Sequence, residues 1–416
     1  MRILWVKIGG LWPLNMGGRL RSFHAIAELA KRHRVTVLTT HGPADDPEGL
    51  KANLKDCERI VSVPYLIPKA GTSRFAVALL GSWLSSYPVD LWKCRVPALR
   101  SKVDEALSAG VDVCVADFLV AAANVPVGGV TPTLLFEHNV EYMIWKRLHA
   151  VETRAWRRAL LAAEWRRMRR YEARACRQAR LTVAVSEADR ALLAANAPGA
   201  DIRAIPTGVD ASYFHPNGTA EKPARLVFTG SMDWYPNEDA IIHFMEAILP
   251  RLRRRIPGLT IAVVGRNPSE RLKALGAAKG VQITGTVDDV RPYVAEAAVY
   301  VVPLRIGGGT RLKIFEAMGM AKAVVSTSIG AEGLPVSDGV NILLADEPSA
   351  FAEAVVRLIT DADRRRLMEQ AARRLVVERY DWSAVAQDFE DALRGLAVAV
   401  RGPRAQQDDP ETVAVS

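Results

Sequence analysis

The chain has 416 residues, of which 49% are hydrophobic, and it carries a formal net charge of +9. This length and apolar content predict a large globular protein of two or three domains with substantial cores. The positive charge favours anionic partners, namely nucleotides, acidic lipid surfaces or nucleic acid, without choosing among them. The four cysteines are scattered, which excludes a disulfide framework or a zinc-binding pattern and is typical of a reduced cytosol.

The first half of the chain alternates short apolar strands with helical stretches. A strand at Ile3–Ile8 leads through a loop containing Gly17 and Gly18 into an apolar-periodic helix. Further strands are predicted at Val35–Thr39, Ile60–Val63, Val111–Ala116, Thr133–Phe136 and Leu181–Val185. The alternation predicts a parallel, Rossmann-like first domain over residues 1–205, although the GxGxxG fingerprint is absent.

A second α/β domain follows a segment rich in turn-forming residues. Residues 206–223 are predicted to be an interdomain linker, and the strand–helix alternation restarts in a second Rossmann-like domain over residues 224–380. Its strands are predicted at Leu226–Thr229, Thr260–Val264, Val281–Thr284, Val299–Val302 and Ala323–Ser326. Residues 381–400 are expected to form a helix that packs back on the first domain, and the polar residues 401–416 a disordered tail.

Two doubly wound domains in tandem predict where a ligand binds. Ligands of such sheets bind outside the carboxyl ends of the strands. The expected fold is therefore α/β, with two sheets whose carboxyl ends face each other across a cleft, and that cleft is the expected active site.

The stretch at residues 301–327 has the pattern of an anion site. An apolar strand is followed by three consecutive glycines and then by a helix, so backbone amides are free to approach a phosphate. Arg311 and Lys313 add cations at the start of that helix. Glu316 lies in an otherwise apolar stretch of it, where a carboxylate requires a partner or a ligand.

Four motifs carry a resemblance to a known family. They are VAVSEAD at Val183–Asp189, IPTGVD at Ile205–Asp210, FTGSMDW at Phe228–Trp234 and the PLRIGGGTRLKIFEAM block. With these motifs, and with the glycine pair after the first strand, the chain resembles the GT-B glycosyltransferases, and within them the retaining family 4 (glycosyl transferases group 1).

The resemblance implies a function for the whole chain up to about Leu396. The expected reaction moves a sugar, with retention, from a nucleotide-diphosphate donor to a glycan or lipid-linked acceptor, in the synthesis of cell-surface polysaccharide or glycoconjugate. The first domain is then on the acceptor side, and the second binds the nucleotide sugar. No cofactor is implied.

The sequence departs from the family pattern at two places. Of the family's paired glutamates, Glu316 matches the second, ribose-binding one, whereas the first falls on Gly308. The amides of Gly308, Gly309 and Thr310 would then hold phosphate or sugar oxygens. The segment after Thr229 also lacks the usual Arg and Lys diphosphate clamp. We hypothesise that Arg311 and Lys313 replace it, because the leaving diphosphate gains charge and requires cations.

The remaining site residues are predicted from their positions after strands. The resemblance places a loop histidine near the donor sugar, and His138 follows a predicted strand, so it joins Glu316 and Arg311 as a candidate catalytic residue. Donor-binding candidates at other strand ends or glycine loops are Gly17, Gly18, Ser231, Arg266 and Thr286. Arg19 and Arg21 either bind phosphate or are solvated. Other histidines, such as His33, look like surface residues.

Two further segments leave alternatives open. The only D-x-D, Asp361–Asp363, is explained by a helix N-cap, so we expect activity without a divalent metal. Residues 145–180 are rich in arginine and contain tryptophan. They either form one long domain helix with solvated arginines or provide a surface for anionic lipid.

Two other functions remain as alternatives to transfer. The first alternative is a nucleotide-sugar epimerase. The second is a non-catalytic GT-B scaffold that binds a glycan or a partner. Nucleic acid is not an expected partner, because the basic segment lacks a recognition module. The N-terminal apolar run is too short for a signal peptide, and residues 75–89 are too few to span a membrane. We therefore expect a cytoplasmic protein, peripheral on the inner face of the plasma membrane if the lipid surface is a partner.

Overall fold

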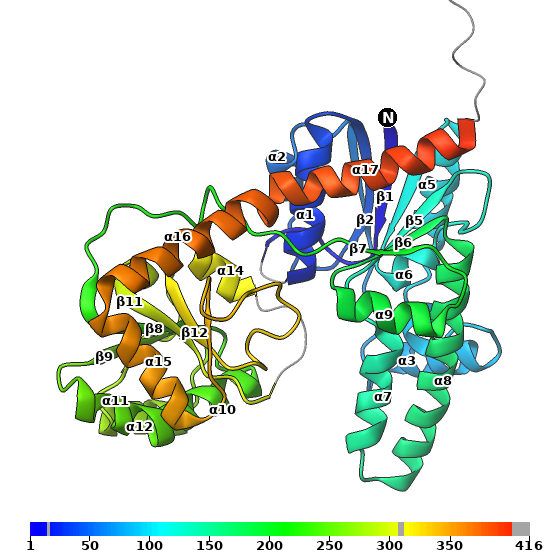
Figure 1. Cartoon of the computed structure of the whole chain (residues 1–416). Helices are drawn as coiled ribbons and strands as arrows, with labels where there is room; N and C mark the ends of the chain where they lie inside the picture. The colour runs from blue at the N-terminus through cyan, green and yellow to red at the C-terminus, as the bar shows by residue number, and fades with distance from the viewer. Residues whose placement is uncertain (15–16, 307–311, 402–416) are drawn as a thin grey trace, which may run out of the picture. The chain divides into compact units, whose positions relative to one another are not determined.

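The computed structural model describes residues 1–14, 17–306 and 312–401. It divides into two compact units, each of which is described by itself. Unit 1 comprises Met1–Pro206 and Val385–Ser416, and unit 2 comprises Thr207–Ala384. Each unit contains one sheet with helices packed around it (Figure 1).

Unit 1 is built on a seven-stranded sheet in the order β3-β2-β1-β4-β5-β6-β7, with all neighbours parallel. Every residue of β4 and β5 is buried, as expected for central strands covered by helices on both faces. The strands are β1 (Arg2–Lys7), β2 (Arg34–His41), β3 (Arg59–Pro64), β4 (Val113–Asp117), β5 (Thr133–Glu137), β6 (Leu181–Ala184) and β7 (Ile202–Ala204). The chain order reverses between β1 and β4, which makes their carboxyl ends the topological switch point.

The connections of unit 1 are helical. They are α1 (Gly17–Ala30), α2 (Pro47–Asn53), α3 (Ser73–Trp83), α4 (Val89–Trp92), α5 (Pro97–Ser108), α6 (Leu119–Ala122), α7 (Glu141–Val151), α8 (Ala155–Gln178) and α9 (Glu187–Asn196). The basic segment 145–180 is not one long helix, because the extended residues Glu152 and Arg154 separate α7 from α8. Figure 1 shows α7 and α8 as a helical hairpin.

The last helix, α17 (Trp382–Arg401), covers the sheet of unit 1 from Val385 onward. The ring of Phe389 lies 5.6 Å from that of Trp5 and 5.0 Å from that of Phe136. The next residue, Glu390, binds Arg32 Nε at 2.7 Å and lies 3.1 Å from His33 Nε2. The expectation that His33 is a surface residue is therefore wrong, since only 5% of its side chain is exposed beside Glu390.

Unit 2 contains a six-stranded parallel sheet in the order β10-β9-β8-β11-β12-β13. Its strands are β8 (Lys222–Thr229), β9 (Thr260–Val264), β10 (Gln282–Ile283), β11 (Ala297–Val302), β12 (Ala323–Ser326) and β13 (Leu343–Leu344). The two parallel sheets confirm the predicted α/β fold. The segment before β8 is fixed to this unit, because the Arg373 guanidinium donates to the carbonyls of Ala211 and Phe214.

The helices of unit 2 surround its sheet (Figure 1). They are α10 (Tyr235–His243), the π-helix η1 (Phe244–Ile248), α11 (Leu249–Arg255), α12 (Glu270–Ala278), α13 (Arg291–Ala295), α14 (Leu312–Gly319), α15 (Pro348–Thr360) and α16 (Ala362–Arg379). The Asp361 carboxylate accepts the Arg364 N–H at 2.9 Å, which confirms the predicted N-cap of α16. In the ranges given above, no helix has the length and apolar character needed to cross a membrane.

Candidate active site

Three polar side chains meet at the switch point of unit 1. Lys7 ends β1, Asp117 ends β4, and His138 directly follows β5, so the parallel register brings them to one edge of the sheet. His138 Nε2 lies 2.8 Å from Asp117 Oδ1, and Lys7 Nζ lies 3.3 Å from Asp117 Oδ2. All three side chains are buried. We call Lys7, Asp117, Phe118 and His138 the His138 cluster.

The His138 cluster is fixed by its neighbours on several sides. Trp5 Nε1 donates to Asp117 Oδ2 at 2.8 Å, and Lys7 Nζ donates to Ser22 Oγ at 2.9 Å. The Phe118 ring stacks on the His138 imidazole, with 3.7 Å between centroids and 15° between planes. The Lys7 ammonium lies over the same ring, with Nζ 4.2 Å from the ring centroid, in a cation–π contact. This packing fixes the orientation of the imidazole.

Gly18 lies against the His138 cluster, which joins two residues predicted separately from the sequence. A Cβ added at Gly18 would lie 2.7 Å from Phe118 Cζ and 3.9 Å from His138 Nδ1. A side chain is therefore excluded at Gly18, whereas a Cβ at Gly17 would meet nothing within 4 Å. Close backbone approach to the Phe118 ring is the physical reason for glycine at position 18.

Burial determines the charge states of the His138 cluster. It lowers the pKa of His138 to about 4, against the opposing pull of Asp117. Burial alone would raise the pKa of Asp117, but Lys7 and His138 together hold it below its usual value. At neutral pH the imidazole is therefore neutral beside an ionised carboxylate. The close contact with that partner favours the proton on Nε2, and among the described residues Nδ1 is buried without a hydrogen-bond partner.

The two arginines of α1 have different environments. Arg19 forms an ion pair with Asp45 at 2.5 Å and donates to the Pro13 carbonyl. Arg21 donates to the His138 carbonyl at 3.3 Å, and burial lowers its pKa to about 10. Arg21 therefore supports the His138 loop rather than being solvated.

In unit 2, Lys313 lies at the carboxyl end of β8. Its Nζ donates to Asn237 Oδ1 at 2.9 Å and is 4.3 Å from the centroid of the Phe228 ring. A Cβ added at Gly230 would lie 2.7 Å from this ammonium, so the glycine keeps the strand end open to it. We call Phe228, Gly230, Asn237 and Lys313 the Lys313 cluster. It places a cation where the sequence predicts an anion site.

Two other predicted residues come together beside this cluster. Arg266 Nε donates to Ser231 Oγ at 2.7 Å, and Ser231 Oγ donates to Asp233 Oδ1 at 2.5 Å. The strand ends approach so closely that a Cβ on Gly265 would lie 1.8 Å from the Gly230 carbonyl oxygen. Thr286 is exposed after β10, and among the described residues the hydrogen bonds of Ser231 and Arg266 do not include it.

Glu316 lies on α14, one turn after Lys313, and is flanked by the buried side chains of Phe315 and Ala317. Burial raises its pKa to about 7, and the ammonium of Lys313 acts in the opposite direction. When the Glu316 carboxyl is ionised, it can accept hydrogen bonds from a diol. The sequence predicts that this diol is the ribose of the nucleotide. Four predicted site residues, Gly308, Gly309, Thr310 and Arg311, lie outside the described residues.

Sequence reasoning missed three polar side chains of these clusters: Lys7, Asp117 and Asn237. A usable signal existed for Asp117, since it directly follows the predicted strand Val111–Ala116 and strand ends carry function in such sheets. Lys7 lies inside a predicted strand, where a lysine would be assigned to a solvated position. Within the ranges the structure describes, no three His, Cys, Asp or Glu side chains gather to hold a metal.

Comparisons with known proteins agree with this architecture. The family described as Glycosyltransferase Family 4 matches residues 18–213, and the family described as Glycosyl transferases group 1 matches residues 223–361. Among solved structures, Anabaena HepE in complex with UDP matches with a TM-score of 0.63 at 15% identity, covering 95% of this chain and 100% of that one. Two α/β units, each with one parallel sheet, match the GT-B fold of solved glycosyltransferase structures.

The chain belongs to group 1, family 4 of these glycosyltransferases. It is 29% identical to the GDP-mannose-dependent alpha-(1-6)-phosphatidylinositol monomannoside mannosyltransferase of Mycobacterium tuberculosis over 48% of this chain and 57% of that protein. It is 30% identical to the phosphatidyl-myo-inositol mannosyltransferase of Mycolicibacterium smegmatis over 51% of this chain and 57% of that protein. The chain thus spans about half the length of the curated relatives it matches.

Proposed function

We propose that the protein transfers a sugar, with retention, from a nucleotide-diphosphate donor to a lipid-linked or glycan acceptor in the synthesis of cell-surface glycoconjugate. One observation carries the proposal: Lys313 and Glu316 are presented together at the carboxyl edge of the unit 2 sheet. The cation suits a diphosphate and the carboxylate suits a ribose diol. The relatives' names make GDP-mannose the first donor to test.

The proposed roles divide between the two units. In unit 2 the donor is bound by Lys313, Glu316, Ser231, Arg266 and Thr286, together with Arg311 and the glycine-loop amides predicted from the sequence. In unit 1, Nδ1 of the neutral His138 accepts a hydrogen bond from a sugar hydroxyl, near the backbone of Gly18. These groups position the substrates and stabilise charge.

The proposed chemistry follows from the resemblance to retaining enzymes. The bond between the sugar C1 and the diphosphate oxygen breaks, and the acceptor oxygen bonds to C1 on the same face. The acceptor proton passes to the departing phosphate oxygen, so an enzyme nucleophile is not required. Lys313 offsets the negative charge that develops on the diphosphate.

A donor screen followed by a transfer assay tests the proposal. Thermal shift with UDP-, GDP- and ADP-sugars identifies the nucleotide, because a ligand that binds only the folded state raises the melting temperature. The identified donor, labelled in its sugar, is then incubated with and without lipid acceptors. Labelled lipid with the retained anomer supports the proposal. Consumption of the donor without acceptor indicates an epimerase, and no nucleotide binding indicates a scaffold.

We also propose that the protein acts at the cytoplasmic face of a membrane. The relatives' names include phosphatidylinositol acceptors, which reside in membranes. In the α7–α8 hairpin, Met168 and Tyr171 are buried in the core, while Trp156 is 64% exposed beside Arg157. A tryptophan next to arginines is suited to the interface of an anionic membrane.

A further inference from the structure

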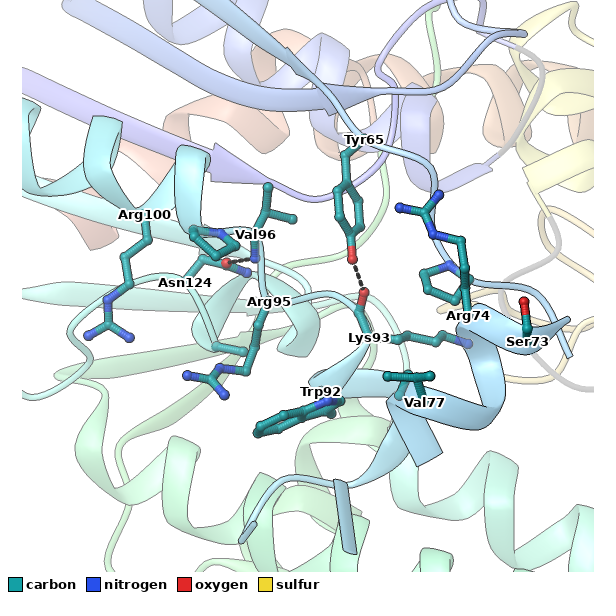
Figure 2. A pocket seen from close by; sticks show the side chains of 14 residues that line it. Tyr65, Ser73, Arg74, Val77, Trp92, Lys93, Arg95, Val96, Arg100 and Asn124 are labelled. Atoms are coloured by element: carbon teal, nitrogen blue, oxygen red, sulfur yellow. Dashed lines mark hydrogen bonds between the residues drawn. The ribbon is translucent and has the colours of Figure 1, made fainter. Parts of the chain in front are cut away.

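A cavity of about 640 Å³ opens in unit 1, and its lining includes no residue of the His138 cluster (Figure 2). It lies between the segment after β3, helix α3, helix α4 and the start of α5. Tyr65 and Trp92 contribute aromatic side chains, and four cationic side chains line it: Arg74, Lys93, Arg95 and Arg100. None of these residues has a role in the function proposed above.

The walls of this cavity are held by buried hydrogen bonds. Asn124, only 1% exposed, accepts the Val96 N–H through Oδ1 at 2.7 Å and donates through Nδ2 to the Cys94 carbonyl at 2.8 Å. Tyr65 donates its hydroxyl to the Lys93 carbonyl at 2.6 Å (Figure 2). The loop that carries Lys93 and Arg95 is therefore held by the protein's own hydrogen bonds, as a preorganised binding site requires.

Of the four cationic side chains that line the cavity, one has a carboxylate partner among the described residues. Lys93 is paired with Asp90. Across the described ranges, however, the guanidinium groups of Arg74, Arg95 and Arg100 form no ion pair with a carboxylate. The Arg95 guanidinium lies 4.8 Å from the Tyr87 ring centroid and 4.7 Å from that of Trp92. A concave site with several unbalanced arginines is suited to a phosphate-type anion.

Helix α3 adds an apolar strip that starts at the cavity. Val77 lines the cavity and is 69% exposed, and Leu80 and Leu84 follow at helical spacing with 59% and 92% exposure. Trp83 is also more than half exposed. Because large apolar side chains gather beside a cationic cavity, their partner is a molecule with an anionic group and a hydrocarbon part.

We infer that this cavity and the exposed strip of α3 bind a lipid acceptor, with its phosphate in the cavity and its hydrocarbon along Val77, Leu80 and Leu84. The inference rests on the proposed function and gives its acceptor a place and a chemical class. Tyr65 follows the end of β3 and Asn124 follows α6 after β4, so the cavity opens near the same edge of the sheet as the His138 cluster.

Vesicle co-sedimentation tests the site directly. The full chain is mixed with vesicles of phosphatidylcholine alone or of phosphatidylcholine with phosphatidylinositol. The double variant Arg74→Gln/Arg100→Gln is expected to lose at least about tenfold in affinity for the second vesicles, since each basic residue near an anionic surface contributes measurably. The control Lys31→Gln/Lys51→Gln removes two exposed charges, one just after α1 and one on α2, and is expected to stay within about twofold.

A second pair of measurements separates a lipid from a water-soluble phosphate. Val77→Ser/Leu80→Ser is expected to weaken vesicle binding and to leave the affinity for inorganic phosphate, measured by calorimetry, unchanged. If the serine variant binds vesicles as the wild type does while Arg74→Gln/Arg100→Gln loses phosphate binding, the occupant is a water-soluble phosphate and the lipid assignment is wrong. If the arginine variant keeps both affinities, the site itself is refuted.

Measurements of donor binding show whether the cavity inference or the proposed function is wrong. Arg74→Gln/Arg100→Gln should retain the wild-type thermal shift with the nucleotide sugar, while its KM for phosphatidylinositol rises. Normal donor binding and transfer with an unchanged acceptor KM would overturn the cavity inference alone. Vesicle binding that depends on these arginines, in a protein that neither binds nor consumes nucleotide sugars, would overturn the proposed function alone.

Discussion

His138 Nε2 lies 2.8 Å from Asp117 Oδ1 although both side chains are at most 1% exposed. A buried carboxylate is costly unless it is paired, and here the ammonium of Lys7 and the indole N–H of Trp5 supply the other partners. The four side chains form one network, so changing the central carboxylate affects all of them.

Replacing Asp117 should therefore destabilise unit 1 strongly. Asp117→Asn leaves the Lys7 ammonium buried without a counter-charge, and breaking a buried pair from one side typically costs about 3–5 kcal/mol. Urea denaturation followed by tryptophan fluorescence measures the loss. Asp201→Asn, at a half-exposed carboxylate, serves as the control and is expected to change stability little. Equal stability of the two variants would contradict the buried network.

The buried imidazole should make stability depend on acid pH. Burial lowers the pKa of His138 from 6.5 to about 4, so between these values the unfolded chain binds a proton that the folded chain does not. Stability from this residue is present above pH 6.5 and is lost as the pH falls, by about 3 kcal/mol in total. His138→Gln should flatten that part of the profile, whereas His215→Gln, at an exposed histidine, should not.

Lys313 should contribute strongly to donor binding. A hydrogen bond to a charged group contributes about 1.5–3 kcal/mol, so Lys313→Met is expected to weaken nucleoside diphosphate binding by about 10- to 100-fold. Calorimetry measures the affinity. Lys273→Met, at an exposed lysine of α12, controls for the loss of one charge. Unchanged affinity in Lys313→Met would show that the Lys313 ammonium does not bind the donor.

Donor binding should strengthen as the pH rises through about 7, where Glu316 ionises. The ionised carboxylate accepts hydrogen bonds from both ribose hydroxyls, which the protonated form does less well. GDP-mannose is the suitable probe, since its diphosphate is esterified at both ends and does not titrate there. Glu316→Gln should remove the pH dependence, and Glu270→Gln, at an exposed residue, should retain it.

The close approach of the residues that follow β8 and β9 should make Gly265 sensitive to the smallest side chain. The Cβ of Gly265→Ala would lie 1.8 Å from the Gly230 carbonyl oxygen, so the backbone must shift. We expect a loss of at least about 2 kcal/mol, at the upper end of overpacking. Gly258→Ala adds a Cβ in open space of the same unit and provides the matched comparison. Equal melting temperatures of Gly265→Ala and Gly258→Ala would show that the backbone at the two strand ends can shift at little cost in stability.

The sequence was sufficient to predict the fold because short apolar runs alternate with helical stretches over most of the chain. It missed β7 and β13, which have three and two residues and carry too little periodicity to detect. It also joined α7 and α8, because the break between them depends on two extended residues in a helix-like pattern.

The polar clusters were only partly predictable. His138, Lys313 and Glu316 follow strand or glycine-loop signals that are local in sequence. The pairing of Lys7 with Asp117 is between residues 110 positions apart, and it depends on the register between β1 and β4, which the sequence pattern does not specify. The charge state of His138 likewise depends on burial that only the folded sheet provides.

The passage of α17 into unit 1 has a consequence for biosynthesis. Trp5 and Phe136 belong to strands that precede unit 2 in the chain, but the Phe389 ring that covers them is translated after unit 2. Unit 1 therefore waits, with an apolar face uncovered, while all of unit 2 is translated. A nascent chain that terminates before Val385 would retain every strand of both sheets and still carry a surface prone to aggregation.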